Sequence, residues 1–357
     1  MPDEKINKIK YKNSRVIQIN PGVVLHRICK LWNILNKHET REQIITEWQV
    51  SVIQNIVREN YDYILVENDM IMCKHVCRVF RHKNVKIIYH MHNGYDTDSK
   101  TPELLKEISG RVDKILAISN YIKNEVLRVS PNANIDVLYN AIDIDSFRVQ
   151  DGVRIAYRKK FSIEEKEPVF IYTGRITEEK GVRELLEAFI KLKNEKTYQQ
   201  AKLLVVGKSW FASDDISEYV KHLQRLADNR NDIVFTGYVL PPEMPSVLAA
   251  ADIAVIPSKW EEPFGLVVLE ALASGLKLVA TNSGAIPEIV DATVAELVDK
   301  DSNFVENLCQ GMKRSLDSNS KTQCVADYLK KHPEFNAKFY FQNFCTCVGI
   351  TSSKERN

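Results

Sequence analysis

The 357-residue sequence has no long apolar run, and no segment approaches the roughly 18 uninterrupted apolar residues of a membrane-spanning helix. Its lysine-rich start also lacks the apolar core of a signal peptide, so we expect a cytoplasmic protein. Neither sign of charge dominates, because 49 Lys and Arg face 47 Asp and Glu for a net charge of +2. The basic excess of a dedicated nucleic-acid binder is therefore missing, and we expect no nucleic-acid partner.

The seven cysteines are an odd number without paired metal spacing, which fits a reducing compartment better than a disulfide framework. Cys73 and Cys77 lie one helical turn apart with His75 between them. This trio has two interpretations, a metal site or two thiols that face a core, and the spacing favours the thiols. The sequence also contains no tandem repeat and no low-complexity tract.

The length and the hydrophobic pattern indicate two α/β domains, because 357 residues are too many for one ordinary core. From Val169 onward, short apolar runs alternate with amphipathic helical patterns, as in a parallel, doubly wound sheet. The strand candidates of this half are Val169–Gly174, Lys202–Gly207, Asp232–Gly237, Asp252–Ser258 and Leu276–Thr281. Those of the first half are Arg15–Asn20, Tyr63–Asn68, Lys86–Asn93, Lys114–Asn120 and Ile135–Asn140.

We therefore predict a Rossmann-like domain over residues 1–160, a second over residues 161–320, and C-terminal helices with a polar tail over residues 321–357. The polar, basic stretch Asp151–Lys166 is the candidate hinge. Helices are predicted over Thr322–Lys331 and Glu334–Val348. Ligands of parallel sheets bind outside the carboxyl ends of the strands, and the candidate chemistry falls there.

Two glutamates stand out in the second domain. Glu270 occupies an otherwise apolar helical stretch, and its neighbours at three and four positions are Leu266, Val267, Ala273 and Ser274. A carboxylate buried there without a partner would cost several kcal/mol. Glu270 is thus expected at an exposed edge, in an internal salt bridge or against a polar ligand. Glu262 lies eight residues earlier, in the segment Glu262-Pro263-Phe264-Gly265.

A cationic loop follows the strand candidate Val169–Gly174. It reads Gly-Arg-Ile-Thr-Glu-Glu-Lys-Gly from Gly174 to Gly181, and it leads into a predicted helix over Val182–Asn194. Arg175 and Lys180 therefore lie near a helix N-terminus. Arginine donates forked hydrogen bonds to phosphate oxygens, lysine adds a point charge, and the helix amides add donors. Such a loop suits a pyrophosphate, whereas taken alone it is equally typical of a solvated strand-to-helix connection.

These segments together resemble glycosyltransferase family 4, a large family of retaining GT-B glycosyltransferases, over roughly residues 60–310. The resemblance implies a GT-B fold, with two Rossmann-like domains of parallel, doubly wound sheets, a cleft between them and terminal helices that cross back. It implies that Arg175 and Lys180 neutralise the leaving nucleoside diphosphate, that Glu270 holds the ribose hydroxyls and that Glu262 contacts the transferred sugar. The implied donor-binding positions are Gly174, Phe264, Gly265, Leu266, Tyr238, Val239 and Glu270. Trp210 either covers the donor or packs against the domain.

On the acceptor side, Tyr89-His90-Met91-His92-Asn93-Gly94 ends a strand candidate in a polar loop. His92 resembles the family histidine near the reaction centre, and His90, two positions away on the same strand face, is the alternative match. Asp96-Thr97-Asp98 superficially matches the aspartate pair of metal-dependent GT-A enzymes. Because Arg175 and Lys180 already supply positive charge, we expect no metal.

The start of the chain departs from the family pattern. Family members open with a strand and a glycine-rich loop, whereas here only Pro21-Gly22 follows Arg15–Asn20. A helix predicted over Val23–Lys37 is either an ordinary surface helix or a peripheral contact with the cytoplasmic membrane face.

The resemblance implies a retaining transferase that moves a sugar from a nucleotide-sugar donor, with a UDP-sugar favoured and no further cofactor. The implied acceptor is a carbohydrate or a lipid-linked saccharide, as in polysaccharide or glycoconjugate biosynthesis. Two alternatives remain. One is a non-catalytic GT-B-like subunit that binds a nucleotide sugar, and the other is a GT-B nucleotide-sugar epimerase.

Overall fold

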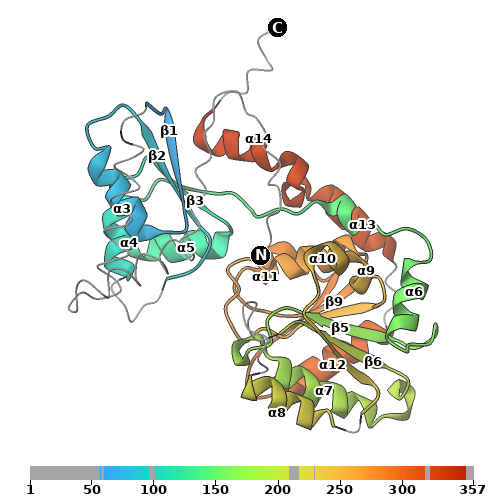
Figure 1. Cartoon of the computed structure of the whole chain (residues 1–357). Coiled ribbons are helices and arrows are strands. Elements are labelled where there is room, and N and C mark those ends of the chain that lie inside the picture. The colour runs from blue at the N-terminus through green and yellow to red at the C-terminus, as the bar shows by residue number, and fades with distance from the viewer. Residues whose placement is uncertain are drawn as a thin grey trace, which may run out of the picture.

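The computed structural model describes residues 57, 60–95, 101–208, 217–228, 230–317 and 322–350. It contains two separate parallel sheets, each flanked by helices, and a pair of C-terminal helices that connects the two halves (Figure 1). The predicted fold class is therefore confirmed. The candidates Arg15–Asn20 and Val23–Lys37, the Asp96 to Asp98 segment and Trp210 lie outside the described residues.

The first sheet consists of β1 (Tyr63–Glu67), β2 (Lys86–Met91), β3 (Lys114–Ala117) and β4 (Ile135–Val137), paired in that order. Helices α3 (Met70–Val79), α4 (Thr101–Ser109) and α5 (Asn120–Val129) connect the strands. Each strand falls within a candidate from the sequence. Cys73 and Cys77 lie on α3 and are buried in the core, where the sequence favours them.

The second sheet consists of β5 (Val169–Thr173), β6 (Lys202–Val206), β7 (Ile233–Gly237), β8 (Ile253–Ile256), β9 (Lys277–Thr281) and β10 (Ala295–Val298). Their order is β10-β9-β8-β5-β6-β7, and all are parallel. Strand β10 was not among the sequence candidates. The chain order reverses between β5 and β8, and doubly wound sheets bind ligands at such a point, outside the strand ends.

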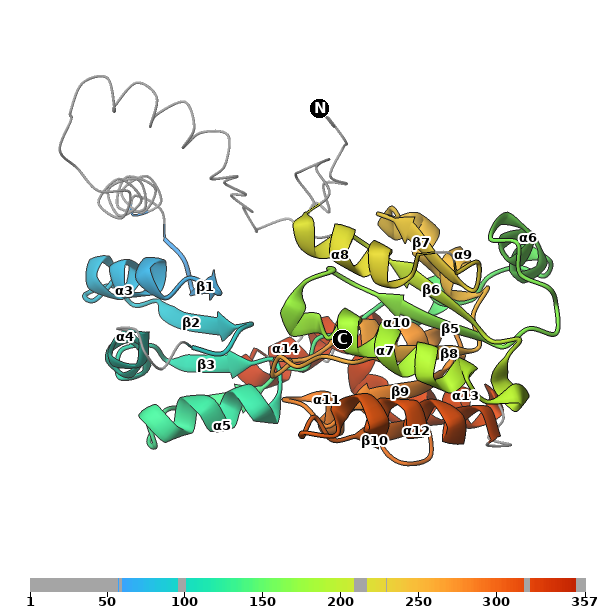
Figure 2. The ribbon, with the colours of Figure 1, turned by 90° about the horizontal axis from the view of Figure 1, so that it is seen from below.

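Helices cover both faces of the second sheet. They are α7 (Val182–Lys193), α8 (Glu218–Leu226), α9 (Met244–Leu248), α10 (Leu266–Ala273), α11 (Ile286–Ile289) and α12 (Phe304–Asp317). Figure 2 shows α7 and α12 lying side by side. Alternate residues of β5 divide between two cores, because Phe170 packs on the α7 and α12 side and Ile171 on the α10 side. Short 3₁₀ turns occupy Ile144–Phe147, Glu178–Lys180, Lys196–Tyr198 and Pro241–Glu243.

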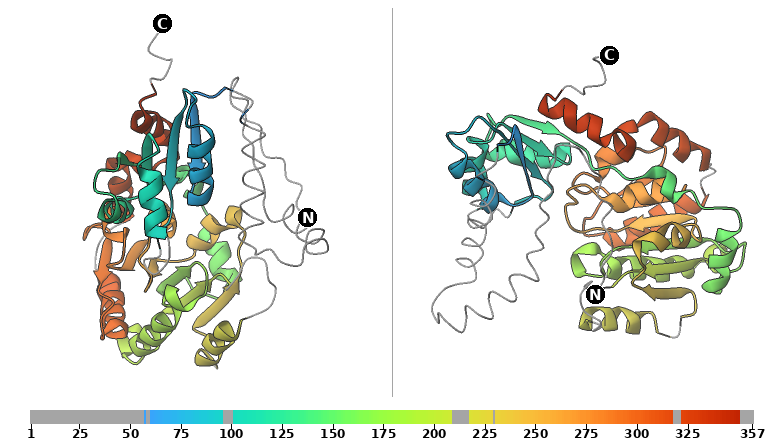
Figure 3. Two further views of the ribbon diagram at one scale, coloured as in Figure 1. Left: turned by 90° about the vertical axis from the view of Figure 1, so that its left-hand side faces the viewer. Right: turned by 45° about the horizontal axis from the view of Figure 1, so that its top comes forward.

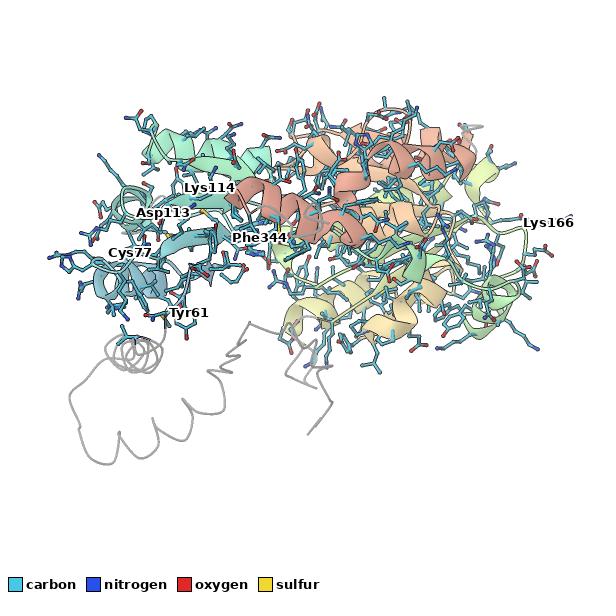
Figure 4. The ribbon with its side chains drawn as sticks, turned by 90° about the horizontal axis from the view of Figure 1, so that it is seen from above. Tyr61, Cys77, Asp113, Lys114, Lys166 and Phe344 are labelled. Atoms are coloured by element: carbon cyan, nitrogen blue, oxygen red, sulfur yellow. The ribbon has the colours of Figure 1, made fainter. Side chains whose placement is uncertain are left out.

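The stretch Asp151–Lys166, which the sequence offers as a hinge, contains helix α6 (Val153–Lys160). This helix is bound to the second domain, because Arg154 donates to the carbonyl oxygens of Ala249 and Ala251 at 2.9 and 2.7 Å. Figure 4 shows Lys166 at the end of the molecule that is remote from the first sheet. The chain therefore crosses between the two sheets before α6.

The C-terminal helices are α13 (Thr322–Lys331) and α14 (Ala337–Val348), separated by a 3₁₀ turn at Pro333–Phe335. The sequence predicts a single helix from Glu334, but α14 begins later because the Asn336 side chain accepts the Lys338 N–H as an N-cap. Helix α14 returns to the first sheet, where Phe344 and Val348 pack against Ile88 (Figures 3 and 4). None of the helices in the described residues combines the length and apolar character needed to cross a membrane.

Candidate donor-binding site

A cavity of about 310 Å³ opens where the loops after β5 and β8 meet, at the point where the strand order reverses. Its volume falls within the range of small-molecule sites. The predicted residues that line it are His92, Gly174, Arg175, Lys180, Glu262, Phe264, Gly265 and Leu266. The predicted residues Tyr238, Val239 and Glu270 do not line it. A larger surface depression of about 810 Å³, bordered by α7 and α12, contains none of the predicted site residues.

Lys180 and Glu262 form an ion pair inside the cavity. The Lys180 Nζ lies 2.6 Å from Glu262 Oε1, and the Ser258 hydroxyl donates to the same oxygen at 2.7 Å. Glu262 is therefore satisfied by protein partners, which is the salt-bridge alternative for a buried carboxylate. An ammonium has three donors, so Lys180 can keep this contact while it donates to a second anion.

Two glycines hold this pair by close backbone contact. Gly181 ends the Glu178–Lys180 turn at φ 69°, and a Cβ there would lie 1.9 Å from the carbonyl oxygen of Pro257. Gly284 has φ 54°, and its Cβ would lie 2.2 Å from the Glu262 carbonyl oxygen. Both positions require glycine, because the backbones of neighbouring loops leave no room for a side chain.

Arg175 is the second cation of the cavity. Its side chain is 40% exposed, and its Nη2 lies 4.0 Å from Glu179 Oε1, which is too long for a hydrogen bond. The Tyr172 hydroxyl donates to the Arg175 carbonyl oxygen and holds the backbone of the loop. The arrangement leaves the guanidinium accessible to an anionic ligand.

Helix α10 begins at the cavity. Gly265 precedes it at φ 103°, and the N–H groups of its first turn have no acceptors within the helix. The ring of Phe264 is 2% exposed and packs with Tyr139 and Phe335, whose centroids lie 6.1 and 6.2 Å away. Phe264 therefore joins the second domain to the first domain and to the C-terminal segment.

Glu270 lies one turn after Leu266 on α10 and is partly buried. Within the described part of the chain, its carboxylate has neither a hydrogen bond nor an ion pair, and burial alone raises its pKa above the ordinary value of 4.5. The salt bridge that would satisfy it is thus missing among these residues. Of the alternatives from the sequence, a polar ligand is the one that would satisfy this carboxylate.

Tyr238 and Val239 follow β7, two strands away from β5 in the sheet. Tyr238 is exposed, and the Lys208 Nζ lies 5.6 Å from its ring centroid. The structure therefore places both residues at the carboxyl end of the sheet but beyond the cavity itself.

His92 lines the cavity, whereas His90 is 1% exposed and does not line it. Both rings contact Glu67 on β1, a residue that the sequence analysis did not single out. Glu67 Oε2 lies 2.8 Å from His92 Nε2 and 2.9 Å from His90 Nδ1. Burial opposes ionisation of Glu67, but the two histidine hydrogen bonds outweigh it and lower its pKa to about 2.

The two domains also meet directly beside the cavity. The Ser119 hydroxyl donates to the Pro263 carbonyl oxygen at 2.7 Å. Glu288, which lies on α11, accepts hydrogen bonds from the backbone N–H groups of Asn120 and Tyr121 at the start of α5. No local pattern could have predicted Glu288, because its partners lie 168 and 167 residues away.

The two parallel-sheet domains and the cavity between their strand ends define a GT-B type protein. The chain belongs to the family described as glycosyl transferases group 1, whose model matches residues 153–332. A second model, described as Glycosyltransferase Family 4, matches residues 15–146.

Individual relatives agree with this assignment. YtcC of Bacillus subtilis is 30% identical over 70% of this chain, and the match spans 63% of its own length. The lipopolysaccharide 1,2-N-acetylglucosaminetransferase of Salmonella typhimurium is 27% identical over 80% of this chain and 70% of its own length. HepE of Anabaena, solved in complex with UDP, superimposes with a TM-score of 0.73 at 19% identity, covering 85% of this chain and 82% of HepE. At that identity the likeness to HepE shows the fold.

Proposed function

We propose that this chain is a retaining glycosyltransferase that moves a sugar from a nucleotide-sugar donor, with a UDP-sugar favoured, to a carbohydrate or lipid-linked saccharide acceptor. The observation that carries the proposal is the cavity at the strand reversal, which brings Arg175, Lys180 and Glu262 together in a member of a glycosyltransferase family. The solved complex of HepE with UDP supports the choice of base, and the Salmonella relative supports a saccharide acceptor.

The donor is held by charge and by hydrogen bonds. Arg175, Lys180 and the first turn of α10 would surround the diphosphate, and losing one such positioned donor costs about 2–4 kcal/mol. Glu270 would accept hydrogen bonds from the ribose hydroxyls, and Tyr238 and Val239 would border the base. With two cations at the diphosphate, the proposed chemistry requires no divalent metal.

Transfer takes place when the two domains enclose donor and acceptor and exclude water. Glu262 and His92 would face the transferred sugar. The acceptor oxygen forms a bond to the anomeric carbon on the face from which the diphosphate leaves, and its proton passes to the departing phosphate oxygen. The configuration is thereby retained, and no side chain is required as a covalent nucleophile.

Product analysis with and without acceptor tests the proposal. We expect nucleoside diphosphate release and a glycosylated product only when a saccharide or lipid-linked acceptor is present, in line with a role in polysaccharide or glycoconjugate biosynthesis at the cytoplasmic membrane face. A changed donor formed without any acceptor would instead identify an epimerase. Donor binding without turnover on any acceptor would identify a non-catalytic subunit.

A further inference from the structure

A polar network joins the ends of β1 and β2 at the edge of the cavity. Glu67 and His90 are register partners in the parallel pair, and His92 follows on the same strand face as His90. Asn68, at φ 52°, accepts the backbone N–H of His92 at 3.0 Å and donates its own N–H to the His90 carbonyl oxygen at 2.8 Å. The backbone that carries His92 is thus held from both sides.

We propose that Glu67 is a positioning residue that holds the His92 imidazole in its Nε2–H tautomer, so that Nδ1 accepts a hydrogen bond from a sugar hydroxyl in the cavity. This inference rests on the proposed function, because it assigns an atom of His92 to the substrate. Glu67 itself need not touch the sugar, since it acts through His92.

The hydrogen-bond geometry determines the tautomer. A carboxylate is only an acceptor, so the nitrogens 2.8 and 2.9 Å from Glu67 Oε2 must both carry protons. These nitrogens are Nε2 of His92 and Nδ1 of His90, which lie 3.2 Å apart. A neutral His92 with Nε2–H has its lone pair on Nδ1. Within the described residues Nδ1 has no partner, and the side chain is 34% exposed where it lines the cavity.

Glu67, His90 and His92 also form the one group in the described residues whose ligand atoms lie close enough to share a metal ion. Two histidines and a carboxylate are a common ligand set for transition metals. A metal-bound histidine, however, almost always donates its other ring N–H to an acceptor. If His90 bound a metal through Nδ1, its buried Nε2 would be such a donor, and Nε2 has no partner. The network therefore fits a hydrogen-bonded pair of neutral histidines better than a metal site.

The test combines tautomer detection with kinetics on the full chain. Histidine is labelled with ¹⁵N, the His92 signals are assigned from the His92→Gln variant, and long-range ¹H–¹⁵N correlations report which nitrogen is protonated. We expect the Nε2–H form in the wild type and in Glu67→Gln, which keeps an acceptor oxygen. Glu67→Ala should lose this preference, whereas Glu103→Ala, which removes an exposed carboxylate from the same domain, should keep it.

Kinetics then connect the tautomer to turnover. Glu67→Ala should lower kcat/KM at least about tenfold, Glu67→Gln should recover most of that loss, and Glu67→Ala should add little in a His92→Gln background. An unchanged His92 tautomer in Glu67→Ala would overturn the inference, as would fully additive losses. So would His92 signals that shift with EDTA and return with Zn²⁺. If no acceptor or donor supports turnover, the proposed function fails while the tautomer result still decides the role of Glu67.

Discussion

At the scale of single residues, the two glutamates near α10 meet burial in different ways. Glu262 receives Lys180 and Ser258, so its charge is neutralised within the protein. Glu270 receives no partner in the described residues and has a raised pKa. Leaving a partly buried carboxylate unpaired lowers stability, and such a cost is commonly found at functional sites.

The proposed division of roles predicts different losses for the two alanine variants. Glu270→Ala should weaken both free nucleoside diphosphate and intact donor, because both contain the ribose. Glu262→Ala should leave diphosphate affinity within about twofold and reduce donor affinity or turnover by roughly 1.5–3 kcal/mol, the range for a hydrogen bond to a charged group. Calorimetry with both ligands measures these differences. Glu187→Ala, which removes a surface ion pair with Arg183, is the matched control.

Equal losses of diphosphate and donor affinity in Glu262→Ala would contradict this division. A Glu262→Ala variant that unfolds would show instead that the pair with Lys180 is chiefly structural, and Glu262→Gln, which keeps an oxygen for Lys180 and Ser258, separates these cases. We expect Glu262→Gln to fold and to retain diphosphate binding.

The raised pKa of Glu270 also predicts a pH-dependent gain in stability for Glu270→Gln. The folded protein holds this proton more tightly than the unfolded chain, so the stability of the wild type falls as the pH rises through the raised pKa. The variant cannot ionise and should be more stable at pH 7 by on the order of 1 kcal/mol. The gain should vanish below about pH 4, where both forms are neutral. Thermal unfolding across pH measures the difference, and a constant gain would count against an electrostatic origin.

Single residues were predicted best where the local pattern contained the signal. Arg175, Lys180 and Glu262 occur in recognisable segments, and all three line the cavity. The contact between Lys180 and Glu262 could not be predicted from pattern, because it spans 82 residues and depends on how two loops meet. Glu67 was missed for a related reason, since only the register of β1 against β2 brings it to the histidines.

At the scale of elements, the Glu178–Lys180 turn determines where Lys180 lies, and Gly181 determines how closely that turn approaches the β8 loop. Gly152, at the start of α6, has a similar positive φ of 87° but no atom within 4 Å of an added Cβ. The two glycines therefore separate backbone strain from steric contact.

Alanine at these two glycines should have unequal effects. Gly152→Ala should cost about 1–2 kcal/mol, the usual penalty for a left-handed residue with a side chain. Gly181→Ala should cost more, because the methyl group would clash with Pro257, and it should weaken donor binding at least about tenfold by displacing Lys180. Chemical denaturation and calorimetry on both variants test this. Similar stability and donor affinity for the two would refute the role of the contact.

The strands were largely predictable because parallel strands covered on both faces are short apolar runs. Candidates within Tyr63–Asn68 and Val169–Gly174 correspond to β1 and β5. Strand β10, Ala295–Val298, was missed because Glu296 interrupts a four-residue run at the edge of the sheet. The start of α14 was placed too early, since the N-cap at Asn336 competes with the helical pattern before it.

At the scale of the whole molecule, the two domains are joined next to the cavity by polar contacts. The Glu288 carboxylate caps the N-terminus of α5 in the other domain, where backbone N–H groups and the helix dipole favour a negative charge. Together with the Ser119 contact to Pro263, this holds the acceptor side against the donor side. Closure is therefore coupled to a specific ion and helix contact.

Removing that contact should impair transfer more than donor binding. Glu288→Ala should leave donor affinity within about threefold, because the donor-binding residues belong to the second domain, and should lower kcat by roughly tenfold or more. Glu296→Ala, which removes a surface ion pair with Arg314 in the same domain, is the control. A variant that loses donor affinity and kcat in parallel would show that Glu288 supports the donor site itself.

The central claim, that the cavity binds a nucleotide sugar through its cations, is tested most directly by calorimetry with a panel of nucleoside diphosphates and nucleotide sugars in the presence of EDTA. We predict that at least one nucleotide sugar, with UDP-sugars foremost, binds the wild type without a divalent metal. Its affinity should fall by about 2–4 kcal/mol in Arg175→Ala or Lys180→Ala. Failure of every nucleotide sugar to bind, or binding that requires Mn²⁺ and ignores both substitutions, would contradict the account.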